Sequence, residues 1–118
     1  MVKVIVFVKR NPALSREEFH RHWREVHARL VAGTPNVARH ILHYEQNPRS
    51  AEDYERGATD YDGVAIACYR SREDMQALFS EPDYLEKIRP DEERLSDAAA
   101  NVWIVSEDEH VVIGDARA

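Results

Sequence analysis

The order of hydrophobic and polar residues along the chain predicts a strand, a helix, two strands, a second helical region and a final strand. Two of the strands are apolar on both faces and rich in β-branched residues, as strands at the centre of a sheet are. The four expected strands are residues 3–9, 37–46, 62–69 and 101–105. A polar loop is expected over 47–61, and a bend with a short additional strand within 107–114. The second helical region should begin after Ser71 and break at Pro82 and Pro90.

The first helix combines a hydrophobic stripe with titratable side chains. It is expected to begin after Ser15, which forms a capping box with Glu18, and to end at Gly33. At about 100° per residue, one face of this helix holds the apolar residues Phe19, Trp23, Val26 and Leu30. His27 falls at the edge of that stripe, where its ring can reach a hydrophobic pocket.

The order β-α-β-β-α-β predicts an α+β fold of the ferredoxin-like type, an antiparallel sheet with both helices on one face. Strands that are apolar on both faces need cover on the second face too, and the predicted elements provide no third layer. We therefore expect a homodimer in which the second face of the sheet packs on the same face of another copy. A single domain is expected over residues 1–118.

Composition limits the classes of partner and the cellular compartment that fit this chain. The net charge is −6, and Lys and Arg are scattered singly, which argues against nucleic acid binding. Cys68 is the only cysteine, so no internal disulfide can form. The apolar runs are too short for a signal peptide or a membrane span, so a cytoplasmic protein is expected. Motifs for metal or nucleotide binding are missing, and we expect neither a metal nor an organic cofactor.

Four side chains are candidates for chemistry. His27 titrates near neutral pH, and partly apolar surroundings would keep it neutral and able to act as a general base. Strand alternation places His40 and Tyr44 on one face, from which both could reach His27; a place for His40 at the dimer interface is equally open. Cys68 lies on a buried strand, as a small core residue or, if a positive charge stabilised its thiolate, as a nucleophile.

The pattern Phe19-x3-Trp23-x3-His27, which follows a strand and an Asn-Pro-x2-Ser turn, resembles the EthD family of dimeric α/β-barrel proteins. The closing stretch from Glu107 to Ile113 resembles the same family. The resemblance covers nearly the whole chain and implies a ferredoxin-like monomer that pairs with a second copy through its sheet to form a barrel. Relatives include small enzymes of aromatic and ether catabolism and of polyketide maturation, many of which work without a cofactor.

The methylmuconolactone isomerases are similar in more detail. The resemblance implies that His27 and Cys68 match a His and a Cys of their pocket. The position of their strand Tyr falls on His40 when the chains are aligned on Gly33-x-Pro35, so the resemblance extends to the pocket more than to the isomerisation. The candidate catalytic residues are therefore His27, His40 and Cys68. The candidate substrate-binding residues are Phe19, Trp23 and Tyr44.

We expect a cofactor-independent enzyme that uses His27 for acid–base chemistry on an apolar small molecule bearing a carbonyl or phenol group. Its reaction would be an isomerisation, cyclisation, dehydration or decarboxylation. One alternative is a monooxygenase, either cofactor-free or with a haem bound by a His. The other is a non-catalytic dimeric protein that binds a ligand or assists an enzyme.

Overall fold

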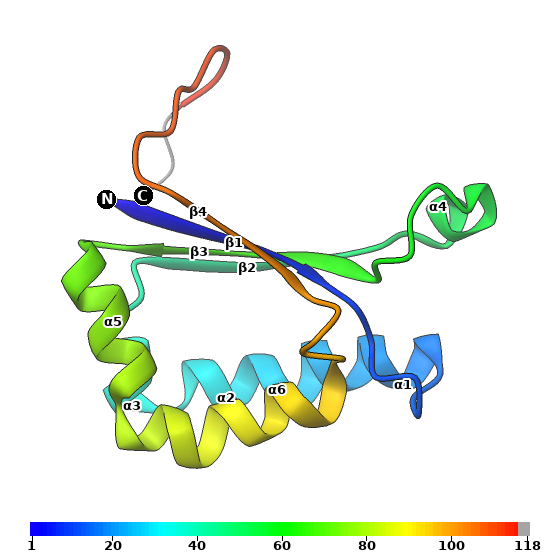
Figure 1. The fold of residues 1–118 in the computed structure, drawn as a ribbon, viewed down its shortest axis with the longest axis horizontal. Coiled ribbons are helices and arrows are strands. Elements are labelled where there is room, and N and C mark those ends of the chain that lie inside the picture. Colours follow the sequence, from blue (N-terminus) through cyan, green and yellow to red (C-terminus); the bar gives the residue numbers. More distant parts are fainter. Residues whose placement is uncertain (116–118) are drawn as a thin grey trace.

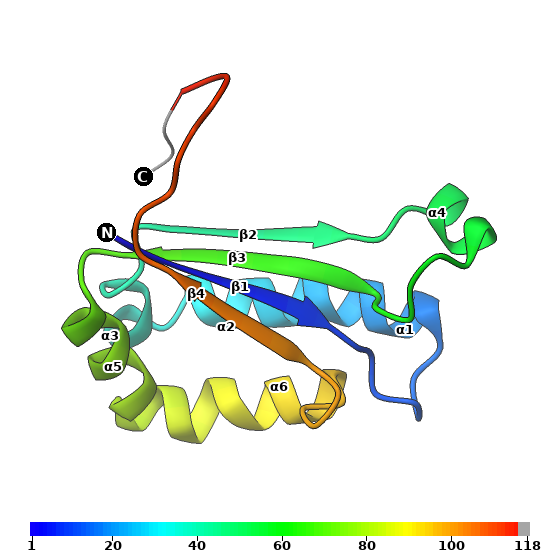
Figure 2. The ribbon, with the colours of Figure 1, turned by 45° about the horizontal axis from the view of Figure 1, so that its top comes forward.

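The structure, a computed structural model, describes residues 1–115; the last three residues of the expected domain lie outside the described part. Four antiparallel strands form one sheet in the order β2-β3-β1-β4, and helices lie along one face of it (Figures 1 and 2). The strands are β1 (Val2–Val8), β2 (His43–Pro48), β3 (Gly63–Tyr69) and β4 (Val102–Ser106). This is the ferredoxin-like α+β arrangement, and the predicted fold class is confirmed.

Two long helical regions form the second layer, and each contains a π-helical segment. The first region consists of α1 (Arg16–Arg21), a π segment (His22–His27) and α2 (Ala28–Ala32). The second consists of α5 (Arg72–Ser80), a π segment (Tyr84–Ile88) and α6 (Arg89–Leu95). Ser15 and Ser71 cap them as predicted, each accepting a hydrogen bond from the backbone N–H three residues later. Among described residues, no helix is long and apolar enough to cross a membrane.

The first π segment decides which side of the helix is buried. The Ala28 N–H donates to the Trp23 carbonyl, five residues back. This wider turn keeps residues spaced by four on one side, whereas in an α-helix that spacing drifts around the axis. The buried residues are accordingly Phe19, Trp23, His27 and Val31. Val26, predicted in the buried stripe, is 47% exposed; that prediction is wrong because it assumed a regular α-helix.

The second strand begins at His43 rather than at residue 37. Residues before it form a short helix, α3 (Pro35–Ala38), with Pro35 in its first turn. Proline is favoured there because its φ is already helical and no donor is needed at that position. His40 therefore lies in the turn after α3 and not on a strand, so the predicted shared face of His40 and Tyr44 is wrong.

Three other expectations about local structure are also wrong. The expected loop over 47–61 contains α4 (Ala51–Arg56), which Ser50 caps and which ends at Gly57 with φ of 62°. Pro90 does not break the second helical region, because it sits in the first turn of α6, directly after a π turn in which the Arg89 N–H donates to the Tyr84 carbonyl. Within the described residues, 107–115 contain bends and no strand, and they project away from the sheet (Figure 2).

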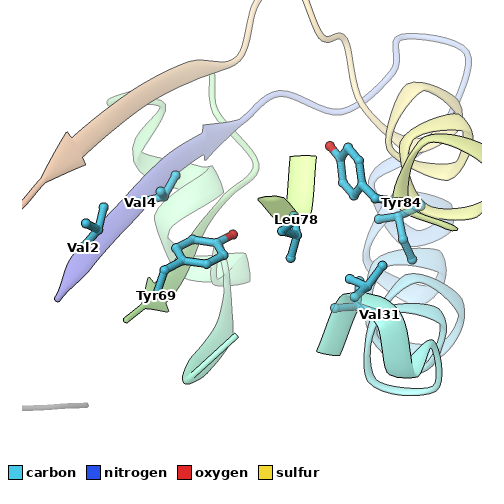
Figure 3. Packing of buried hydrophobic residues seen from close by; sticks show 8 residues of the cluster. Val2, Val4, Val31, Tyr69, Leu78 and Tyr84 are labelled. Atoms are coloured by element: carbon cyan, nitrogen blue, oxygen red, sulfur yellow. The ribbon is translucent and has the colours of Figure 1, made fainter. Parts of the chain in front are cut away.

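Alternate side chains of the sheet face opposite ways. One set packs on the helices: Figure 3 shows Val2, Val4 and Tyr69 of the sheet on one side of the core, and Val31, Leu78 and Tyr84 of the helical layer on the other. The opposite set includes two apolar rows that follow the strand register. Their members are Ile104, Ile5 and Ile66 in one row and Val102, Phe7 and Val64 in the next. We call these six residues the open-face rows.

The helix phase set by the first π segment predicts how two substitutions change the free energy of unfolding. Phe19→Ala should lower the free energy of unfolding by about 3–5 kcal/mol, because the Phe19 ring is fully buried. Val26→Ala should change it by about 0.5 kcal/mol or less, because Val26 is nearly half exposed. Urea unfolding followed by circular dichroism measures both. Equal losses in the two variants would contradict the helix phase described above.

Candidate active site

A cavity of about 750 Å³ lies between the helical layer and the sheet. Its sheet wall is apolar, and the small side chains of Ala65 and Ala67 on β3 leave room above the sheet. Its helix wall carries His27 from the first helical region and, from α6, Arg89, Glu92 and Glu93. Three tyrosines, one each from β2, β3 and the second π segment, also line it: Tyr44, Tyr69 and Tyr84. Such a cavity suits a largely apolar molecule with a few oxygen atoms.

His27 is fixed by a buried carboxylate from the neighbouring helix. Its ring, 4% exposed, hydrogen-bonds through Nδ1 to Asp91 Oδ2 at 2.8 Å. Asp91 is 3% exposed, and its other oxygen, Oδ1, is 2.7 Å from His22 Nε2. When Nδ1 of a neutral His27 donates to Asp91, the lone pair of the ring lies on Nε2. Asp91 thereby selects the form of His27 that can accept a proton in the cavity.

Burial and the carboxylate act on His27 in opposite directions. Burial lowers the pKa of His27 below its ordinary value of 6.5, and the hydrogen bond and charge of Asp91 reverse only part of that shift. For Asp91 itself, burial raises the pKa, but the hydrogen bonds from His22 and His27 outweigh burial and leave that pKa below its usual value. At neutral pH the pair is therefore a carboxylate and a neutral imidazole, as a general base requires.

Gln46 joins the first helix to Tyr44. Its Nε2 donates to the Trp23 carbonyl at 3.0 Å, inside the π turn, and to the Tyr44 hydroxyl oxygen at 3.2 Å. Because the Tyr44 oxygen accepts from Gln46, its own hydrogen can be donated to a bound molecule. Burial raises the pKa of Tyr44, so this donor stays protonated. Gly63 lets the Trp23 ring lie this close to the sheet, because a Cβ there would come within 2.7 Å of the ring.

Glu92 follows Asp91 on α6 and lies half-buried in the cavity wall. The Tyr84 hydroxyl donates to Glu92 Oε1 at 2.6 Å. Burial raises the pKa of Glu92 to about 7, although the Tyr84 hydrogen bond works in the opposite direction. The cavity thus holds a base whose pKa is lowered by burial, His27, and a carboxyl group whose pKa is raised to about 7, Glu92.

The structure brings together three of the six residues predicted for the site: His27, Trp23 and Tyr44 line the cavity. Phe19 is fully buried behind Trp23, with ring centroids 5.4 Å apart, and supports the cavity wall without lining it. His40 lies outside the cavity and pairs through Nδ1 with Asp74 at the start of α5. The expectation that His40 reaches His27 fails because the strand that was to carry it begins only at His43.

Cys68 also lies outside the cavity. Residues Ala65, Ala67 and Tyr69 of β3 face the helices, so Cys68 between the last two faces the other side of the sheet. Burial raises the pKa of its thiol, and the charge of Lys3 reverses this only in part. A protonated thiol on the wrong face of the sheet does not fit a nucleophile for this cavity.

The sequence did contain a signal for the carboxylates that the prediction missed. Asp91 and Glu92 fall at helical spacing between the buried residues Ile88 and Leu95, so they interrupt an apolar stripe. A carboxylate in such a position needs a partner, which points to a site. The expected break at Pro90 hid this pattern by ending the stripe at Ile88. Within residues 1–115, no group of three or more His, Cys, Asp or Glu side chains is placed to hold a metal ion.

Solved structures with the same fold come from several bacteria. An EthD family protein of Bacillus halodurans superposes with a TM-score of 0.68, at 15% identity, over 92% of this chain and 99% of that one. A dimeric protein of unknown function from Bacteroides fragilis gives 0.67 at 12% identity, over 91% and 95%. SnoaB, a cofactor-independent oxygenase of Streptomyces nogalater, gives 0.62 at 14% identity, over 94% and 95%.

Two curated relatives are similar in sequence. Dehydratase aurZ of Gibberella zeae is 24% identical over 114 residues, which cover 89% of this chain and 75% of the relative. The conidial pigment biosynthesis dehydratase EthD of Metarhizium robertsii is 24% identical over 105 residues, covering 81% and 74%. The sequence model of the EthD domain matches residues 11–99, which include His27, Asp91 and Glu92. The chain therefore belongs to the EthD family.

Proposed function

We propose that this protein is a cofactor-independent dehydratase that removes water from an apolar molecule with a hydroxyl group β to a carbonyl. The observation that carries the proposal is the His27–Asp91 pair, a neutral base at the wall of a largely apolar cavity. The proposal is supported by the two curated relatives, both of which are named dehydratases. It selects dehydration from the wider set of reactions that the sequence predicts.

The first step assigned to the site is removal of a proton from the carbon between the carbonyl and the hydroxyl-bearing carbon. His27 Nε2 takes this proton, and the electron pair moves toward the carbonyl oxygen to form an enolate. Tyr44 donates its hydroxyl hydrogen to that oxygen, where negative charge develops. Asp91 stabilises the imidazolium that His27 becomes. The carbonyl then re-forms, a carbon–carbon double bond forms as the carbon–oxygen bond breaks, and the hydroxyl group takes up a proton and leaves as water.

A paired comparison tests His27. We expect His27→Gln to lower kcat/KM by roughly 10²–10⁴-fold, the usual contribution of a general base, and His22→Asn to lower it much less. Both side chains bond to Asp91, but only His27 lines the cavity. The substrate is the aldol adduct of benzaldehyde and acetone, whose dehydration gives a conjugated ketone followed by its absorbance. In the wild type, activity should fall as the pH drops through the lowered pKa of His27.

Unchanged activity of His27→Gln, with thermal melting like that of the wild type, would contradict the assignment. Equal losses of activity in His27→Gln and His22→Asn would also contradict it, because the loss would then come from weakening the contact between the helices at Asp91 and not from removing the base.

A second candidate reaction, cofactor-free oxygenation, is favoured by the structural likeness to SnoaB. Oxygen uptake that is stoichiometric with substrate loss would establish oxygenation in place of dehydration.

We also propose that the protein is a homodimer whose two copies meet through the open-face rows. These six side chains form a contiguous apolar surface across the middle of the sheet, bordered on β2 by Glu45 and Asn47. Val102 and Ile104 are 41% and 47% exposed in the single chain. An apolar sheet face of this kind is commonly covered by a symmetric partner. The structural likeness to a dimeric protein supports the proposal.

Matched charge substitutions test the interface. Ile104→Glu should convert the dimer to a monomer at micromolar concentration, because it buries two charges against each other at a symmetric interface. Val26→Glu should leave the dimer intact; Val26 is 47% exposed, like Ile104, but lies on the first helix. Light scattering with size exclusion measures both. A monomeric wild type, or a dimer split as readily by Val26→Glu, would rule out this interface.

A further inference from the structure

We infer that Glu92 is the acid of this site, which protonates the leaving hydroxyl group while His27 acts as the base. The inference rests on the proposed dehydratase function and adds a second catalytic residue to it. Elimination of water needs such a group, because hydroxide is a poor leaving group and departs readily only as water. Glu92 lines the same cavity as His27 and comes from the helix that holds the His27 ring in place.

Asp91 and Glu92 occupy consecutive positions on α6, so their side chains point in different directions and can have different roles. Successive residues of an α-helix point about 100° apart. Asp91 points at the two histidines of the first helix and is bonded to both. Glu92, one position on, faces the cavity and the sheet. One turn of α6 thus carries the group that orients the base and the group that supplies the acid proton.

Tyr84 sets the orientation of the acid. Its hydroxyl donates to Glu92 Oε1 at 2.6 Å, so Oε1 accepts and the acid proton resides on Oε2. Burial among the tyrosines favours the neutral form of the carboxyl and brings its pKa to about 7. Between the lowered pKa of His27 and that of Glu92, a neutral base and a protonated acid are present together.

The proton balance closes with these two groups alone. His27 Nε2 takes the proton from carbon, the carbon–oxygen bond breaks, and Glu92 Oε2 gives its proton to the departing oxygen. The products are the unsaturated carbonyl compound and one water molecule. Glu92 is left as a carboxylate and His27 as an imidazolium, and transfer of one proton between them, through water in the cavity, restores both. No oxidant or reductant takes part.

Glu92 should therefore set the alkaline limit of activity. A general acid must be protonated, so kcat/KM should fall as the pH rises through about 7. The Tyr84 hydrogen bond lowers the Glu92 pKa, so Tyr84→Phe should move this limit to higher pH. Besides His27, which shares the cavity, the titratable and charged groups that act on Glu92 or respond to it are Tyr84, Tyr69, Tyr44, Arg89, Asp91 and Glu93.

Two substrates that differ in their leaving group distinguish the effect of the acid Glu92 from that of the base His27. The two substrates are the aldol adduct of benzaldehyde and acetone and its acetate ester, from which acetate departs without needing a proton. Glu92→Gln should lower the rate on the hydroxyl substrate by roughly 10²–10⁴-fold but leave the rate on the ester near that of the wild type. His27→Gln should slow both substrates. Glu86→Gln, an exposed position on the second π segment, should change neither.

The role of Glu92 would be overturned if Glu92→Gln lowered the rates on both substrates equally. It would also be overturned if Glu92→Gln kept full activity on the hydroxyl substrate. Wild-type protein that eliminates neither water from the hydroxyl substrate nor acetate from the ester would instead overturn the proposed function. Infrared difference spectroscopy gives a readout that does not depend on turnover. Wild-type protein titrated across neutral pH should show the carbonyl band of a protonated carboxylic acid, which Glu92→Gln lacks and Glu86→Gln retains. A band unaffected by Glu92→Gln would contradict the inference.

Discussion

The buried carboxylate of Asp91 is the interaction on which the rest of the site depends. Burying this charge between two helices is costly, and hydrogen bonds from His22 and His27 offset the cost. The same bonds join the first helix to α6, and they determine which nitrogen of His27 carries the proton. A single group therefore links the two helical regions beside the cavity and prepares the base. Without it, His27 would be a buried imidazole with no fixed orientation.

The π segments explain how both helical regions present functional side chains to one cavity. In the first, the wide turn keeps Trp23 and His27 on the side that faces the sheet, and Gln46 donates to the Trp23 carbonyl within that turn. In the second, the π turn places Tyr84 in the cavity wall and leads into α6, which brings Asp91 and Glu92. Such insertions are rare in helices and are frequent at functional sites. Here their effect is to change the helical phase where the cavity requires it.

Features that local patterns determine can be predicted from the sequence, whereas features that depend on the phase of the helices cannot. The fold class, the strands β1 and β3 and the caps at Ser15 and Ser71 follow from apolar patterning and capping residues. The burial of His27 and the exposure of Val26 do not follow, because a π turn has no simple sequence signature. The prediction of a strand at His40 takes Pro35 only as the end of a helix, whereas Pro35 lies in the first turn of α3. Asp91 and Glu92 could have been found from the apolar stripe that they interrupt.

The proposed chemistry requires that Asp91 hold His27 as a neutral base with its lone pair on Nε2. The most direct test is nitrogen NMR of the His27 ring across a pH titration, in the wild type and in Asp91→Asn. We expect a proton on Nδ1 at neutral pH and a His27 pKa below 6.5 in the wild type. Because the carboxylate raises the His27 pKa, Asp91→Asn should lower it further. A proton on Nε2 at neutral pH, or a His27 that is charged at pH 7, would show that His27 is not the base of this site.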